Sequence, residues 1–139
     1  MKDGILIVIG AIGGFISYIL GGWDTALTTL VIFMVIDYIS GLMVAGIFKK
    51  SGKTESGSLS SNIGWKGLCK KVGTLFIVAV SAQLDIVLNA GFIKDAAIIA
   101  FISNECISLM ENAGLMGIPI PKPLLNAIDV LKNKADEQK

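Results

Sequence analysis

Residues 26–48 read ALTTLVIFMVIDYISGLMVAGIF, a stretch in which Asp37 is the only charged residue. At about 1.5 Å per residue, a helix of this length crosses the roughly 30 Å hydrocarbon core of a bilayer. Its twelve Leu, Ile, Val and Phe residues supply about −5 kcal/mol toward insertion, whereas one central acid opposes it by about 3 kcal/mol. The stretch therefore predicts a transmembrane helix.

Three other segments are candidates for membrane helices. Residues 4–20 carry no charge, and residues 72–93 again contain one central acid, Asp85. A cleaved signal peptide is the alternative for 4–20, but residues 21–24 offer no A-x-A-like cleavage site followed by a soluble domain. Residues 96–112 are too polar to insert alone, so they span only if protein or water covers their polar stripe, or they lie in the interface. We expect an all-α integral membrane protein with three to four transmembrane helices in a single domain.

The composition agrees with a membrane protein and excludes much chemistry. Of the 139 residues, 53% are hydrophobic and 17% are charged, against about 25% charged in soluble domains. There is no His and no Arg, which removes imidazole catalysis, His metal ligands and guanidinium recognition of phosphate. Cys69 and Cys106 match no metal or redox spacing. No enzyme, cofactor, metal or nucleic-acid partner is expected.

The charges predict the orientation in the membrane. Residues 49–71 contain six Lys and one Glu, which makes them the cytoplasmic loop by the positive-inside rule. Within this loop, residues 51–61 resemble a flexible linker and 62–71 a short interfacial helix. The first two segments then form a hairpin with Trp23 at its outer turn, and the N-terminus is cytoplasmic. Residues 122–139 are expected to form an amphipathic tail whose helix opens at Pro123.

Acidic residues lie inside the apolar segments, and no Lys lies within those segments. We therefore expect them to lack a cationic partner, and to stay protonated or to face water. Helical spacing places them on one polar face of each helix. The ten candidate residues of these pore-lining or oligomer-contacting faces are Asp37, Gly41, Ser81, Asp85, Asn89, Asn104, Glu105, Ser108, Glu111 and Asn112. These faces either hold a helix bundle together or line an aqueous space when several chains assemble.

Two pairs of small residues are spaced for close helix packing. They are Gly10 with Gly14 in the first segment, and Gly41 with Ala45 in the second. Small residues four positions apart let helix backbones approach each other in membranes. Both pairs are candidates for contacts between chains, although such spacings also arise by chance in a Gly-rich apolar helix.

Several motifs lie between about residues 37 and 125, one of which is Gln83-Leu84-Asp85. The others are Asp37-Tyr38-Ile39-Ser40-Gly41, Gly64-x-x-Gly67-x-x-x-Lys71 and the run Asn104-Glu105-x-x-Ser108-x-x-Glu111-Asn112-x-x-x-x-Gly117-x-Pro119-x-Pro121. Together these motifs resemble the phage holin family that includes the clostridial toxin-secretion holins.

This resemblance implies a multi-pass protein of the bacterial cytoplasmic membrane. Such a protein homo-oligomerises in the lipid bilayer into lesions that release an endolysin, or a toxin, and lead to host cell lysis. A small ion or proton channel, or a transporter subunit, is the alternative, because it would use the same buried acids. The two differ in size selectivity: a channel passes ions, whereas a lesion passes folded protein.

Overall fold

The computed structural model describes residues 1–138, which form five helices and no strand. The helices are α1 (Lys2–Ile19), α2 (Thr25–Gly46), α3 (Ser61–Val87), α4 (Ile93–Leu115) and α5 (Lys122–Glu137). Three of them, α1, α2 and α3, are long and apolar enough to cross a membrane. The predicted all-α membrane fold is confirmed.

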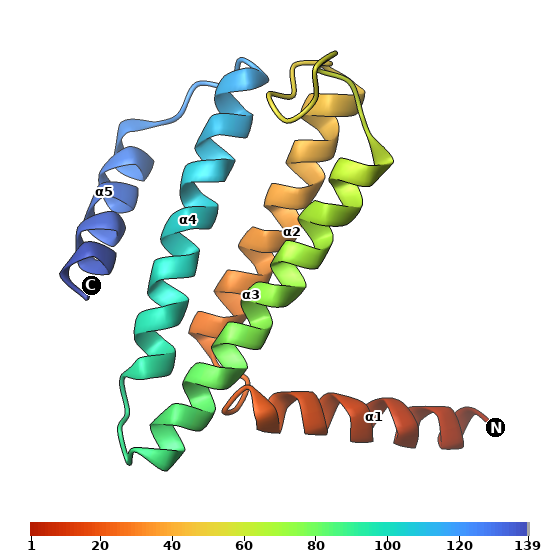
Figure 1. Ribbon diagram of the computed structural model, residues 1–139, viewed down its shortest axis with the longest axis vertical. Helices are drawn as coiled ribbons and strands as arrows, with labels where there is room; N and C mark the ends of the chain where they lie inside the picture. The colour runs from red at the N-terminus through yellow and green to blue at the C-terminus, as the bar shows by residue number, and fades with distance from the viewer. Residues whose placement is uncertain (139) are drawn as a thin grey trace.

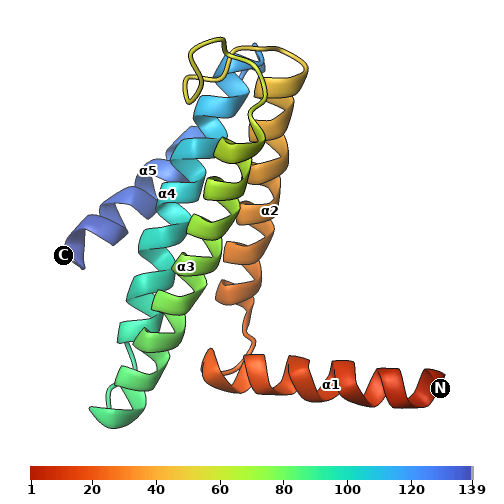
Figure 2. The ribbon, with the colours of Figure 1, turned by 45° about the vertical axis from the view of Figure 1, so that its right-hand side comes forward.

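α4 is the central helix of a bundle with α2 and α3, and α5 packs against its outer side (Figures 1 and 2). Four side chains are fully buried between these helices: Leu27 and Leu30 of α2, Val78 of α3 and Ile98 of α4. Of the polar stripe of α4, Glu105, Ser108 and Asn112 are half-buried against its neighbours, whereas Asn104 and Glu111 are exposed. Protein therefore covers only part of the stripe in a single chain.

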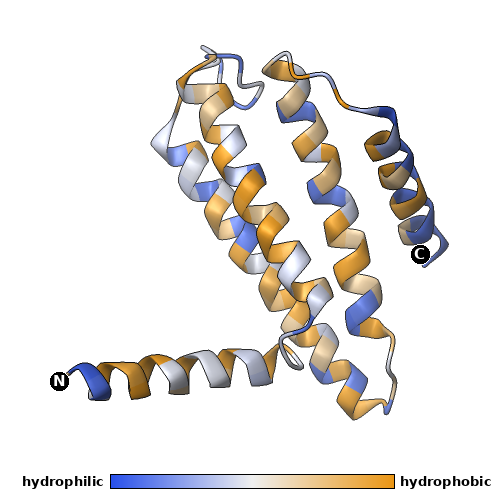
Figure 3. Ribbon diagram, turned by 180° about the vertical axis from the view of Figure 1, so that it is seen from behind, coloured by the Kyte–Doolittle hydropathy of each residue, from blue (hydrophilic) through white to orange (hydrophobic). Residues whose placement is uncertain are grey.

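α1 projects away from the bundle (Figure 2), and residues 1–16 are all exposed. Within the described residues α1 contacts α3 and not α2, so the expected α1–α2 hairpin is wrong. The turn explains the departure, because Gly21 and Gly22 both have positive φ values of 78° and 92°, which glycine adopts without strain. Figure 3 shows that this projecting helix is largely apolar.

α3 starts at Ser61 and runs without a break to Val87. The segment expected as loop at 49–71 is therefore loop only from 47 to 60, and the expected interfacial helix is the first part of α3. Tyr38 explains where α3 sits, because its hydroxyl donates a hydrogen bond to the Gly64 carbonyl at 3.2 Å. A Cβ at Gly64 would lie 3.5 Å from that hydroxyl oxygen, and one at Gly67 would lie 4.0 Å from the ring.

α5 has the amphipathic character that the sequence predicts. It begins at Lys122 with a proline in its first turn. Ile128 and Ala135 are buried, while Leu124 is 51% exposed. Only part of the apolar stripe therefore faces α4. Lys139, at the end of the predicted tail, lies outside the described residues.

Candidate functional site: a polar cluster inside an apolar bundle

One lysine joins two acids from different helices. The Nζ of Lys71 on α3 lies 2.7 Å from Oδ2 of Asp37 on α2 and 2.9 Å from Oε2 of Glu105 on α4. The three side chains are 17%, 12% and 14% exposed, respectively. Such a triad links all three bundle helices through charge-assisted hydrogen bonds.

The expectation that these acids lack a cationic partner is wrong. The charge pattern placed Lys71 at the end of a loop, whereas it lies within α3. The sequence did contain a signal, since Gly64, Gly67 and Lys71 recur at i, i+3 and i+7 and so share one helix face. The face that contacts Tyr38 through its glycines presents Lys71 to the same neighbouring helix.

Asn112 completes the hydrogen bonding around Asp37. Its side-chain amide donates to Oδ1 of Asp37 at 3.0 Å, to the Asp37 carbonyl at 3.3 Å and to Oγ of Ser40 at 2.9 Å. The Ser40 hydroxyl in turn donates to the Asp37 carbonyl at 3.0 Å. Buried carboxylates are tolerated when their oxygens are paired in this way. Among the described residues, no buried side-chain N or O atom lacks a partner.

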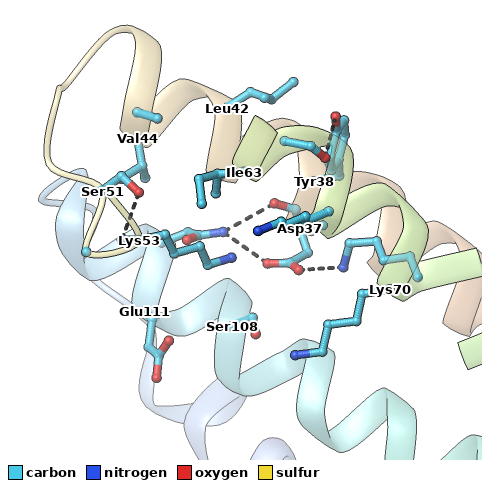
Figure 4. Close-up of a pocket in the computed structure, with 18 of the residues that line it drawn as sticks. Asp37, Tyr38, Leu42, Val44, Ser51, Lys53, Ile63, Lys70, Ser108 and Glu111 are labelled. Atoms are coloured by element: carbon cyan, nitrogen blue, oxygen red, sulfur yellow. Dashed lines mark hydrogen bonds and ion pairs between the residues drawn. The ribbon is translucent and has the colours of Figure 1, made fainter. Parts of the chain in front are cut away.

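Most of the predicted polar face lines one cavity. The cavity has a volume of about 920 Å³ and lies between α2, α3, α4 and the 47–60 loop. Figure 4 shows Asp37, Ser108 and Glu111 around it. The seven predicted residues that line it are Asp37, Gly41, Asn104, Glu105, Ser108, Glu111 and Asn112. The structure thus brings together the faces predicted on the second and fourth segments.

The three residues predicted on the third segment lie elsewhere. α3 ends at Val87, and Asn89 lies in the following turn with a φ of +50°, so the expected stripe of Ser81, Asp85 and Asn89 is wrong. Ser81 is buried and donates to the Ile77 carbonyl at 2.8 Å.

Asp85 lies on α3, where its side chain caps the start of α4 and does not line the cavity. Its carboxylate accepts hydrogen bonds from the backbone N–H groups of Ile93 at 2.9 Å and Lys94 at 3.0 Å. An acid at this place satisfies orphan N–H groups and complements the positive end of the helix dipole. Hydropathy did not indicate this role, because a predicted span that continues to residue 93 hides the turn.

A buried lysine at the same end holds the turn between α1 and α2. Lys94 is only 7% exposed, and its Nζ lies 2.9 Å from the Gly22 carbonyl, 3.4 Å from the Gly21 carbonyl and 3.2 Å from Oδ2 of Asp24. Partial burial raises the pKa of Asp24, but hydrogen bonds from the Leu27 N–H and the Lys94 ammonium lower it by more. The pKa of Asp24 is therefore below its ordinary value.

The two small-residue pairs have different surroundings. A Cβ at Gly10 or Gly14 would meet nothing within 4 Å. A Cβ at Gly41 would lie 3.9 Å from Nδ2 of Asn112, and Ala45 is buried. The second pair is therefore used within one chain, where it lets α2 approach α4.

The sequence profile of the bacteriophage holin family matches residues 14–133. The chain belongs to this family. The resemblance seen in the sequence is thereby confirmed, and the holin motifs now have places in space: Asp37, Gly64, Gly67, Lys71, Glu105 and Asn112 meet at one cluster. In the remaining motif, Gln83 donates to the Ile19 carbonyl at 3.2 Å and Asp85 caps α4.

Similar chains occur in species of Listeria, Halalkalibacterium and Clostridium. An uncharacterized protein of Listeria monocytogenes is 37% identical over 138 residues, covering 99% of this chain and 90% of the relative. One from Halalkalibacterium halodurans is 38% identical over 130 residues, or 89% of both chains. A protein of Clostridium perfringens, described as an uncharacterized 14.9 kDa protein in the nagH 3' region, is 36% identical over 126 residues, or 89% of both. No solved structure matches this holin-family chain.

Proposed function

We propose that this protein acts as a holin, which homo-oligomerises in the bacterial cytoplasmic membrane and forms lesions that release an endolysin or a toxin. The observation that carries the proposal is membership of the bacteriophage holin family over residues 14–133. Three helices long and apolar enough to span a membrane support the location.

The polar cluster suggests how one chain could be harmless before lesions form. In the single bundle, Asp37 and Glu105 are paired with Lys71 and shielded by α2, α3 and α4. The outside of the bundle is largely apolar. A chain of this kind can accumulate in lipid without opening a polar path, because the charges of Asp37, Lys71 and Glu105 are paired inside the bundle.

Lesion formation then requires the polar faces of α2 and α4 to turn toward water between chains. The half-buried groups Asp37, Glu105 and Asn112 would gain hydration in the assembled state. Their hydration therefore contributes to the free-energy difference between the two states. We include α4 in the lesion wall on this ground, because its polar residues line the same cavity as Asp37. α1 contributes an apolar surface to neighbours or lipid.

The basic loop and the first turns of α3 are proposed to face the cytoplasm. The turn held by Lys94 then lies at the outer surface. A cytoplasmic N-terminus would require α1 to turn at Gly21 and Gly22 until it lies along the bundle, a direction that differs from the projecting one seen in the single chain.

Expression in a bacterial host together with a cytoplasmic endolysin tests the proposal. We expect loss of membrane potential, followed by endolysin activity outside the cytoplasmic membrane and lysis. Loss of potential with the endolysin retained would instead indicate an ion channel. Retention of both, with abundant protein in the membrane, would overturn the proposal.

A further inference from the structure

Four lysines line the cavity that contains the polar cluster. Lys53 comes from the 47–60 loop, and Lys66, Lys70 and Lys71 come from α3. Within the described residues, Lys71 is the one of these four that forms an ion pair. Lys53, Lys66 and Lys70 are exposed, and Figure 4 shows Lys53 and Lys70 extending into the space between the loop, α3 and α4.

The charges around the cavity leave an excess for an anion. Its lining contains four lysines and three acids, because Lys71 is shared between Asp37 and Glu105 and Glu111 is the third acid. An ammonium group is a compact point charge that binds phosphate without a fixed geometry. The excess of one positive charge suits a group with one negative charge, such as a phosphodiester.

The walls of the cavity are of two kinds. Hydroxyl groups of Ser51, Thr54 and Ser60 line its loop side, whereas Leu42 and Ile63 line it from α2 and α3. A free inorganic anion would use only the first kind of wall. An amphiphile with a phosphate at one end would use both, and basic pockets at the cytoplasmic side of membrane helices commonly bind such headgroups.

We propose that this cavity binds the phosphodiester headgroup of an anionic phospholipid from the inner leaflet. Lys53, Lys66 and Lys70 hold the phosphate, while Leu42 and Ile63 contact the glycerol and upper acyl chain. This inference rests on the membrane placement given under the proposed function. Because the loop, α3 and α4 all contribute to the cavity, a bound headgroup stabilises their closed arrangement by mass action.

The test uses the full-length protein in detergent micelles that contain equal amounts of phosphatidylglycerol and phosphatidylcholine. Native mass spectrometry counts the lipids retained on wild type and on the double variant Lys66→Gln/Lys70→Gln. We expect wild type to retain more phosphatidylglycerol than phosphatidylcholine. In the double variant the ratio of bound phosphatidylglycerol to bound phosphatidylcholine should fall about thirty-fold, which corresponds to ~1 kcal/mol for each of two lysines near a membrane surface.

Lys49→Gln/Lys50→Gln is the matched control, because it removes the same charge from exposed residues that do not line the cavity. It should retain the preference. An equal loss in both double variants, or no preference in wild type, would overturn the proposal in favour of diffuse attraction or no binding. Circular dichroism of each variant checks that the helices remain.

A second arm separates the two sources of phosphate. Inorganic phosphate added at millimolar concentration should leave phosphatidylglycerol bound, whereas its displacement would show a site for free phosphate and overturn the lipid assignment. Endolysin release is measured separately for wild type. Endolysin release without a preference for phosphatidylglycerol would overturn only this inference. A preference for phosphatidylglycerol without endolysin release would overturn only the proposed function.

Discussion

Lys71 is the residue that links α2, α3 and α4 through ion pairs. It offers one positive charge to two carboxylates, so the triad holds more negative than positive charge when all three groups are ionised. Removing one partner from a buried ionic cluster is far more costly than the cluster is favourable, because an uncompensated charge remains. In this cluster, loss of the lysine would leave two acids facing each other.

We therefore expect Lys71→Met to lower the free energy of unfolding by about 3–5 kcal/mol. The measurement is unfolding by sodium dodecyl sulfate in mixed micelles, followed by circular dichroism. Adding Glu105→Gln should recover part of the loss, because only one carboxylate then remains. If the double variant is no more stable than Lys71→Met, repulsion between the acids is not the cause.

Reasoning from single residues identified the acids of the cluster, but not the residues that donate hydrogen bonds to them. Hydropathy alone singles out Asp37 and Glu105, since a charge in an apolar run needs an explanation. It treated Asp85 as equivalent to Asp37, yet Asp85 caps α4 while Asp37 accepts from Lys71 and Asn112. The difference depends on where α3 ends, and hydropathy does not mark that point.

At the scale of elements, the turn between α1 and α2 is held by a residue of another helix, α4. Lys94 at the start of α4 binds two carbonyls of this turn and Asp24, and Asp24 also accepts from the Leu27 N–H at 2.8 Å to cap α2. One carboxylate thus serves the beginning of α2 and the first turn of α4.

This arrangement predicts a pH dependence. The pKa of Asp24 is lowered in the folded protein, so its contribution to stability is complete above the ordinary value of 3.8 and is lost as pH falls through the lowered pKa. We expect the thermal midpoint of wild type to exceed that of Asp24→Asn near neutral pH, with the difference shrinking in acid. A difference that is constant with pH would show that ionisation of Asp24 does not matter.

Helix existence was predictable here, whereas helix ends were not. A hydropathy window finds where a helix is apolar, so it placed the third span at 72–93 although the helix runs from Ser61 to Val87. Residues 62–71, expected as a separate interfacial helix, are the first turns of this helix, and they pack Gly64 and Gly67 on Tyr38. This contact between distant residues decides where the helix begins.

At the scale of the whole molecule, α1 projects from the bundle and, among the described helices, contacts α3 alone. The sequence predicted its length and apolar character, but its direction follows from the two glycines of the turn and from the Lys94 contacts. Its surface includes Gly10 and Gly14, beside which a larger side chain would meet nothing in the same chain.

We expect the double variant Gly10→Leu/Gly14→Leu to leave membrane insertion unchanged but to shift the sizes of cross-linked oligomers and to delay lysis, because a close contact with another chain is lost. Gly4→Leu is the control, since it also has open space around it but lies on another side of the helix. Identical cross-linking ladders for wild type and the double variant would remove α1 from the contacts between chains.

A projecting arm also bears on the symmetry of assembly. When the arm of one copy rests on the body of the next, the two surfaces in contact are different, and such head-to-tail contacts close into a ring only if the rotation between neighbours is an exact fraction of a turn. Otherwise the array continues to grow by addition at its open end. Lesions built in this way would have a broad distribution of diameters that increases with copy number in the membrane, rather than one diameter fixed by the chain.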